Sequence, residues 1–366
     1  MNEQTRPRIL FNVIVCLGVA IFLGMAIVFS FRAVDFARGK DFWVDEKFGL
    51  EGTVRPASYY QLLTRGARGQ GSAAPLDYVF IKALDQVYQK SFAYIPHNVY
   101  YRLNSTFWDL ALGLLVAFLF LYAFYRKTDN NAIIIMQLVL IGTALLTFYF
   151  KKDNMYFAGE MRPYALWNSL WYVMLALVML RVSKIWIFLT GIFLAFTSLG
   201  ALMQIPALAL VYFTFEVIDQ KRPAAALREA ALVFGLPFLI AVFYALQGDK
   251  FGYIASAADY QRYQNEFFSF WVSKWRVPFI SGAGILLTAW NRQWRGCTAV
   301  FVTMLLLYGM APALNYKILS SSFFFTSRQY LYYDLVFPLF YLMLALVLPE
   351  YWNMIFRLKN KSEKKS

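Results

Sequence analysis

Three short segments of this sequence gather charged and aromatic side chains that could bind or transform a charged substrate. They contain Asp45 and Glu46, then Glu160, Arg162 and Tyr164, and finally Arg328 and Tyr330. A carboxylate can exchange a proton with a reacting group or bind a hard cation. An arginine binds phosphate or carboxylate oxygens through a planar fork of donors. The residue types therefore permit acid–base chemistry and anion binding, provided that the fold brings the segments together.

Each segment also has a purely structural interpretation. Adjacent acids occur in ordinary solvated loops. Glu160 and Pro163 suit the start of a helix, where a carboxylate complements the helix dipole and proline loses no hydrogen bond. Arg328 could be an anchor at the membrane interface. Arg162 is not explained in this way, because a cation is mildly unfavourable at a helix N-terminus.

The composition shows what kind of scaffold must hold these segments. Of the 366 residues, 60% are hydrophobic and only 15% are charged, whereas about 25% are charged in soluble domains. This balance excludes a soluble enzyme, a disordered chain and a nucleic-acid-binding domain, because soluble surfaces need more charge. Unbroken apolar runs of roughly 20 residues favour helices over the alternating strands of a membrane barrel. The sequence predicts an all-α polytopic membrane protein.

About ten apolar runs are candidates to cross the bilayer. They are Ile9–Phe31, Thr106–Tyr125, Ala132–Phe150, Ala165–Leu180, Ile185–Leu202, Pro206–Val217, Ala231–Leu246, Pro278–Trp290, Ala299–Leu314 and Leu331–Leu348. Proline lacks a backbone donor, so the tripeptide Gln204-Ile205-Pro206 predicts a tight turn or a broken helix. We expect a single transmembrane domain that comprises residues 1–366.

Basic residues alternate along the chain in a way that predicts its orientation. The formal net charge is +14, and cytoplasmic loops of membrane proteins collect Lys and Arg. With the N-terminus inside, every short inner connection is basic, and an even number of spans returns the basic tail to the same side. These connections contain Arg126 and Lys127, Arg181 and Lys184, Lys221, Arg222 and Arg228, and Arg292 and Arg295. Both termini are therefore predicted to be cytoplasmic.

Two outer segments carry most of the mass outside the predicted membrane. The first outer loop, residues 32–105, contains apolar residues at helical spacing between Leu76 and Tyr88, with polar residues on the opposite face. This pattern predicts an amphipathic helix that lies along the interface. The second outer loop, residues 247–276, is rich in tyrosine. Function is therefore expected on the outer side.

Metal and disulfide chemistry have little support in the sequence. Cys16 lies inside the first apolar run, Cys297 lies at the start of a late one, and His97 is the single histidine. Two such cysteines fit neither a disulfide framework nor a zinc site. The carboxylates could still hold a divalent cation.

The order of the motifs resembles the GT-C class of membrane glycosyltransferases, in particular proteins related to protein O-mannosyltransferases and to the lipid A aminoarabinose transferase. The shared features are the Asp45-Glu46 pair, an Ala74–Leu84 stretch like the family's "SPLYYLLLKLW", Arg102 before the second span, and an "E-x-R-x-Y-A-L" opening of the fourth span from Glu160 to Leu166. Arg328 and Tyr330 look like the family's Arg-Tyr element with one residue inserted. The resemblance covers roughly the N-terminal half of the chain.

The resemblance implies a sugar transferase at the outer face of a cell (inner) membrane. Such enzymes move a sugar from a polyprenyl-phosphate donor to a lipid, glycan or protein acceptor. It implies catalytic roles for Asp45 and Glu46, with Asp45 as the base, and inversion at the anomeric carbon. It implies donor phosphate binding by Arg162 and Arg328, and substrate binding or orientation by Glu160, Tyr164 and Tyr330. No cofactor, metal or nucleic-acid partner is expected.

Some features of the sequence depart from this family or fit another class. Asp77 stands where the family has an apolar or aromatic residue, and no soluble domain follows the last span. Ionisable residues inside spans, such as Asp109 and Asp334, would also suit a lipid-linked oligosaccharide flippase or another secondary transporter. A polysaccharide polymerase or ligase and a non-catalytic assembly partner are further alternatives.

Overall fold

Helices make up every regular element that the structure, a computed structural model, describes. The description covers residues 5–70, 75–125, 130–219, 221–247, 257–313 and 327–363. The elements of the first half are α1 (Thr5–Arg38), α2 (Val44–Lys47), η1 (Phe48–Val54), α3 (Tyr59–Leu63), α4 (Pro75–Val87), η2 (Tyr88–Phe92), α5 (His97–Tyr125), α6 (Asn131–Tyr149), α7 (Lys152–Ala158) and α8 (Tyr164–Met179). Those of the second half are α9 (Lys184–Ala195), α10 (Ala201–Ile218), α11 (Pro223–Leu246), α12 (Ala257–Ser273), α13 (Arg276–Thr288), η3 (Arg292–Trp294), α14 (Arg295–Ala313), η5 (Ser327–Leu335) and α15 (Val336–Glu363).

The long helices have the length and hydropathy of membrane spans. Among the described residues, 7 helices are long and apolar enough to cross a bilayer, namely α1, α5, α6, α10, α11, α14 and α15. This confirms a multi-pass, all-α membrane protein. The shorter apolar helices α8, α9 and α13 coincide with the remaining predicted spans, but they fall below the roughly 20 residues of a full crossing. The number of about ten spans therefore stays a prediction.

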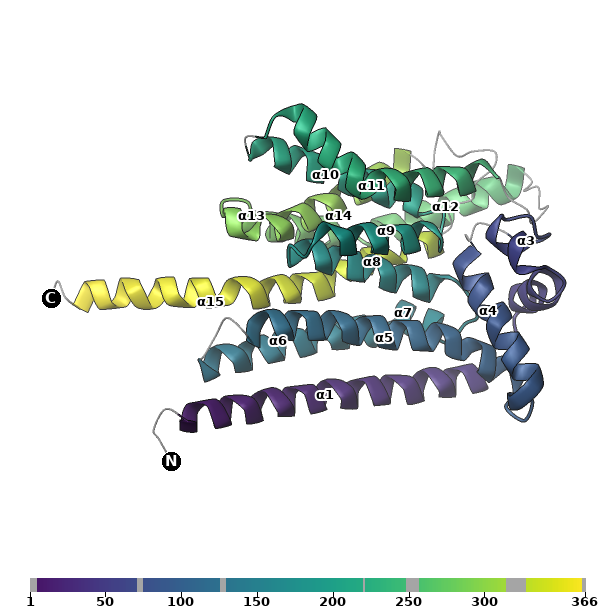
Figure 1. Cartoon of the computed structure of the whole chain (residues 1–366), viewed down its shortest axis with the longest axis horizontal. Coiled ribbons are helices and arrows are strands. Elements are labelled where there is room, and N and C mark those ends of the chain that lie inside the picture. Colours follow the sequence, from purple (N-terminus) through teal and green to yellow (C-terminus); the bar gives the residue numbers. More distant parts are fainter. Residues whose placement is uncertain are drawn as a thin grey trace.

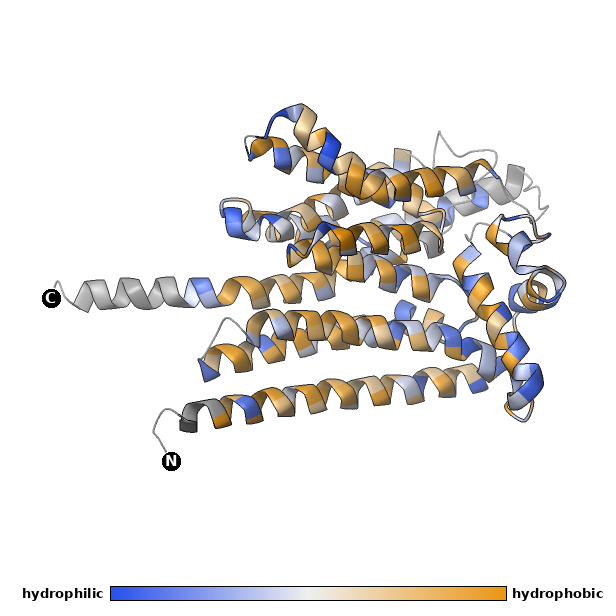
Figure 2. Cartoon of the chain, viewed as in Figure 1, coloured by the Kyte–Doolittle hydropathy of each residue, from blue (hydrophilic) through white to orange (hydrophobic). Residues whose placement is uncertain are grey.

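The long helices run side by side, so the molecule has two distinct ends (Figure 1). The start of α1 and the end of α15 project from one end, which we call the terminal end. The short helices α3 and α4 cover the opposite end, which we call the loop end. Apolar residues occupy the bodies of the helices, whereas polar residues gather toward both ends (Figure 2). This distribution is what a bilayer around the middle of the bundle requires.

Both helices that flank the predicted first outer loop reach past its predicted bounds of 32–105. Helix α1 continues to Arg38 and α5 already begins at His97, which leaves residues 39–96 between the two helices. Both helices extend because they pack on each other beyond the apolar runs: Ala33 and Ala37 are buried, and so is Arg102 near the start of α5. A helix is present where the amphipathic one was predicted, as α4, but its buried residues are Pro75, Asp77 and Ile81, whereas Val87 of the predicted apolar face is exposed. The second outer loop contains α12, and residues 248–256 lie outside the described residues.

The predicted break at Gln204–Pro206 is wrong. Helix α10 runs without interruption through Pro206, and the chain turns earlier, between α9 and α10. There the hydroxyl of Ser198 accepts a hydrogen bond from the N–H of Gly200 at 3.1 Å. Gly200 is pressed against the ring of Trp167, where a Cβ atom would collide. The turn before α10 therefore lies at Gly200, where the close approach to Trp167 needs a glycine, and not at Pro206.

Helix α8 is the central helix of the bundle. Every residue from Ala165 to Met179 is buried, and α8 packs against α5, α9 and α14. A helix that is apolar on all sides must be enclosed by other helices. Because α8 is held so firmly, the residues immediately before it, Glu160 and Arg162, have a fixed position at the loop end.

Candidate active site at the loop end

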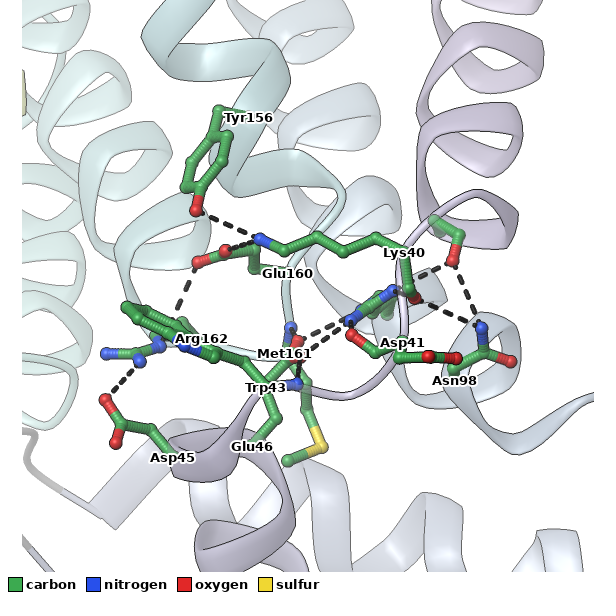
Figure 3. Close-up of polar contacts among 12 residues, drawn as sticks. Lys40, Asp41, Trp43, Asp45, Glu46, Asn98, Tyr156, Glu160, Met161 and Arg162 are labelled. Carbon is green, nitrogen blue, oxygen red and sulfur yellow. Dashed lines mark hydrogen bonds and ion pairs between the residues drawn. The ribbon is translucent and has the colours of Figure 1, made fainter.

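Three chain segments that are distant in the sequence meet beside the start of α8 (Figure 3). The first follows α1 and includes Lys40, Trp43 and the short helix α2. The second is the start of α5, which supplies Arg102. The third is the turn between α7 and α8, which supplies Glu160 and Arg162. The site is therefore built from the ends of membrane helices rather than from a separate domain.

A fully buried ion pair joins these segments. The Arg102 guanidinium donates through Nε to Glu46 Oε1 at 3.0 Å and through Nη2 to Glu46 Oε2 at 2.7 Å. Its nitrogens also donate to the backbone carbonyls of Ala37, Lys40 and Asp41 at 2.6–2.8 Å. Both side chains have no exposed surface. The guanidinium thereby covers the end of α1 and fixes the chain that leaves it.

Glu46 accepts further hydrogen bonds from the backbone. The N–H of Trp43 donates at 2.9 Å and the N–H of Met161 at 2.7 Å. Burial alone would raise the pKa of Glu46, but the hydrogen bonds from Arg102, Met161 and Trp43 outweigh it and lower the pKa. The carboxylate is therefore ionised and enclosed. Its contacts suit a positioning role, and the catalytic role that the resemblance implies for Glu46 stays a prediction.

Asp45 is the accessible member of the acidic pair. Its side chain is 44% exposed and forms an ion pair with Nη2 of Arg162, which is only 13% exposed. The Arg162 guanidinium also lies over the Trp43 ring, 4.8 Å from its centroid. The aromatic face and the carboxylate thus hold an arginine whose edge is open to a ligand at the surface.

Behind this pair lies a second cation, Lys40, which the sequence interpretation missed. Its ammonium group donates to the hydroxyl of Tyr156 at 3.0 Å and to the buried carboxylate of Glu160. Burial alone would lower the pKa of Lys40, but the hydrogen bonds to Glu160 and Tyr156 outweigh it and raise the pKa. The other Glu160 oxygen lies 3.9 Å from Nε of Arg162. Glu160 therefore sits between two cations and holds both at the site.

Of the remaining predicted site residues, Tyr164 lies beside the site, Tyr330 lies in another cluster, and Arg328 is only partly described. Tyr164 begins α8, interacts electrostatically with Arg162, and packs its ring on Phe157 with 5.1 Å between centroids. Tyr330 is buried in an aromatic cluster, where its ring lies 5.0 Å from that of Phe267 in α12. The backbone of Arg328 belongs to η5, but its side chain lies outside the described residues. The structure thus brings Asp45, Glu46, Glu160 and Arg162 together.

A second charged cluster lies on the other side of α7. Asp334 forms ion pairs with Lys151 at 2.6 Å and with Lys274 at 2.8 Å, and Lys274 also pairs with Asp153 at 3.2 Å. The sequence alone left Asp334 without a partner. No local spacing could have shown this cluster, because its members come from three separate segments.

Asp77 provides a pH-dependent element of the outer loop. It is buried, and its carboxyl accepts a hydrogen bond from Asn104 in α5 at 3.0 Å. Burial raises the pKa of Asp77 to about 7 from 3.8. Below pH 3.8, the ordinary pKa of the carboxyl, Asp77 is protonated in both the folded and the unfolded protein. As the pH rises toward about 7, only the unfolded state ionises, so stability falls across this window and then levels off.

We expect Asp77→Asn to flatten this dependence, because Asn is neutral and retains an oxygen for Asn104. The measurement is the melting temperature of purified protein in detergent between about pH 4 and pH 8. Glu51→Gln, a change at an exposed carboxylate of the same loop, should keep the wild-type slope. Equal slopes in Asp77→Asn and wild type would contradict the role of Asp77.

Neither a metal-binding cluster in the described residues nor a similar known protein indicates the function of this site. Within the described ranges, no group of three or more His, Cys, Asp or Glu side chains is placed to hold a metal ion. Comparisons with protein-family models, curated proteins and solved structures found no match for this chain.

Proposed function

We propose that this protein is a GT-C type membrane glycosyltransferase that moves a sugar from a polyprenyl-phosphate donor to an acceptor hydroxyl. The observation that carries the proposal is the pairing of an accessible carboxylate, Asp45, with a largely buried arginine, Arg162, at the loop end of the bundle. A phosphate with a membrane-embedded tail has its charge at this depth, where Arg162 and Lys40 offer compensating cations. The motif order described above provides the second support.

The residues suggest a single displacement at the anomeric carbon. The donor phosphate takes the place of Asp45 on the Arg162 guanidinium, with Lys40 nearby, and so releases the Asp45 carboxylate. Asp45 accepts the proton of the acceptor hydroxyl as its oxygen forms a bond to the anomeric carbon. The bond from that carbon to the phosphate oxygen breaks, and the electron pair leaves with the phosphate. Attack opposite the leaving group inverts the anomeric centre.

The donor role of Arg162 can be tested by a conservative change. Arg162→Lys keeps the charge but loses the planar fork, so we expect donor use to weaken by about tenfold or more. The measurement is the rate of sugar transfer by purified protein against the concentration of a lipid-phosphate sugar donor. Arg276→Lys, at an exposed arginine that begins α13, is the matched control. Arg328→Lys tests the second predicted phosphate ligand in the same assay.

Wild-type donor dependence in Arg162→Lys would show that the arginine is only an anchor, since either cation can reach the interface. An absence of any transferred sugar with wild-type protein, across polyprenyl-phosphate donors of different sugars, would contradict the proposed activity itself.

The proposed orientation places both termini in the cytoplasm and the site on the outer face of the cell (inner) membrane. It is supported by the basic residues Arg181, Lys184 and Arg295, which line the connections at the terminal end, because cytoplasmic connections are the basic ones. Reporters fused near Lys221 and near Gly66 should read inside and outside, respectively.

One observation favours the alternative of a transporter. Asp109 in α5 is fully buried within the bundle and bonded to the hydroxyl of Ser169 in α8. Buried acids in membrane helices are typical of proton relays. Reconstituted protein distinguishes the two activities, because a transporter moves a labelled lipid-linked sugar across the bilayer without transferring it.

A further inference from the structure

A second polar pocket opens at the terminal end of the bundle, away from the candidate active site. It has a volume of about 220 Å³ and lies between the ends of α8, α9, α10 and α14. Its lining includes the cations Arg181, Lys184 and Arg295, the polar residues Tyr212 and Glu216, and the apolar residues Val182 and Ile187. The pocket therefore combines cationic and apolar side chains.

Arg181 holds a backbone conformation that favours glycine. Its φ is 54°, in the left-handed region, which is costly for a residue with a Cβ atom. The position closes α8: the N–H of Val182 donates to the carbonyl of Leu177 at 3.0 Å and the N–H of Arg181 to that of Val178 at 3.1 Å. This helix ending is usually made by glycine. An arginine here indicates that its side chain is needed in the pocket.

A close contact between two helices brings a further arginine to the pocket. Gly296, near the start of α14, is pressed against the last carbonyl oxygens of α8, where a Cβ atom would collide with that of Val178. This approach places Arg295 beside the pocket, where its Nη2 donates to the carbonyl of Phe215 at 2.5 Å. Backbone packing thus holds the largely buried Arg295 at the pocket, whereas Arg181 and Lys184 are exposed at its rim.

The carboxylates nearby do not neutralise all of these cations. Lys184 pairs with Glu229 at 2.7 Å, and Arg295 pairs with Asp219. Glu216, the acid that lines the pocket, pairs with Lys221. Among the described residues Arg181 has no ion pair, and its guanidinium donates only a long hydrogen bond of 3.4 Å to the carbonyl of Arg292. Its fork of donors is thus open to an anion.

We infer that this pocket binds the phosphate of an anionic membrane phospholipid. Arginine and lysine recognise phosphate oxygens, with the guanidinium as a two-point ligand. The apolar residues of the lining favour a lipid over a free phosphate, because an acyl chain can lie against Val182 and Ile187 while the headgroup meets the cations. Basic pockets between membrane helices are known to hold such headgroups. The inference needs the bundle to span a membrane but does not depend on the proposed transferase activity.

Arg181→Gly gives a sharp test, because glycine relieves the left-handed backbone while it removes the cation. The purified full chain in detergent should melt at the wild-type temperature or above when no lipid is added. Wild type should gain melting temperature with phosphatidylglycerol and not with phosphatidylcholine. In Arg181→Gly we expect the midpoint concentration of phosphatidylglycerol to rise about tenfold or more. Lys184→Gln should show a smaller rise.

Arg228→Ala serves as the matched control, because Arg228 is exposed at the same end in α11 and does not line the pocket. It removes the same charge and should leave the midpoint unchanged. An equal response of Arg181→Gly and wild type to phosphatidylglycerol would overturn the inference. Stabilisation by inorganic phosphate at the same concentrations would overturn the assignment to a lipid.

Discussion

Replacing Asp45 with Asn should lower sugar transfer by roughly two to four orders of magnitude, the usual contribution of a general base. Asn preserves the shape of the side chain but cannot accept the proton of an acceptor hydroxyl. The fold should survive, because the Asp45 carboxylate is 44% exposed and exposed ion pairs contribute little to stability. The measurement is single-turnover transfer from a lipid-phosphate donor, together with a melting curve of the same sample.

Asp41→Asn is the control for this experiment. Asp41 is an exposed acid in the same segment, and the hydrogen bond it accepts from Arg102 uses its backbone carbonyl rather than its side chain. It should transfer sugar at the wild-type rate. Normal turnover by Asp45→Asn would remove Asp45 from the mechanism, whatever the outcome for Arg162.

The largest effect on stability is expected from Arg102→Met. This change leaves the fully buried Glu46 carboxylate without its ion-pair partner, and removing one partner of a buried pair costs about 3–5 kcal/mol. It also leaves the carbonyls of Ala37, Lys40 and Asp41 without their guanidinium donor. We expect a large drop in melting temperature, or a low yield of folded protein after extraction in mild detergent.

A second change separates the buried charge from the lost packing. Adding Glu46→Gln to Arg102→Met removes the uncompensated charge and keeps one acceptor for the N–H groups of Trp43 and Met161, so it should restore part of the stability. Arg55→Met tests an exposed pair, in which Arg55 lies 3.2 Å from Asp85 and is 37% exposed. This variant should lose about 1 kcal/mol or less. A similar loss from Arg55→Met and Arg102→Met would contradict the structural role of the buried pair.

The sequence predicts the membrane helices well because their signal is local. Apolar runs and the amphipathic spacing of α4 can be read within one segment. Tertiary packing decides two features that the local pattern does not show: α1 and α5 extend past their apolar runs, and the turn before α10 lies at Gly200 rather than at the predicted Pro206. In each case a contact with another helix, absent from the local pattern, determines where the helix ends.

The candidate site was predictable only in part. The motif order indicated Asp45 and Arg162, but adjacent acids look alike in a sequence. Neighbouring residues on a helix point about 100° apart, so α2 buries Glu46 and exposes Asp45. The roles of Lys40 and Arg102 depend on partners that are 120 and 56 residues away. For these two residues the sequence offered one signal, the family resemblance that includes Arg102. That resemblance did not identify Glu46 as the partner of Arg102.

The hydrogen bonds of Glu46 also set the order in which the site can be assembled during synthesis. Arg102 can reach Glu46 once α5 has emerged, because the two residues are 56 positions apart. The donor from Met161 is 115 positions away and becomes available only after α6 and α7 have followed. The nascent protein must therefore hold the Asp45 segment incompletely bonded while α5, α6 and α7 are made. The cluster is completed late in the biogenesis of this chain, although its first carboxylates are made early.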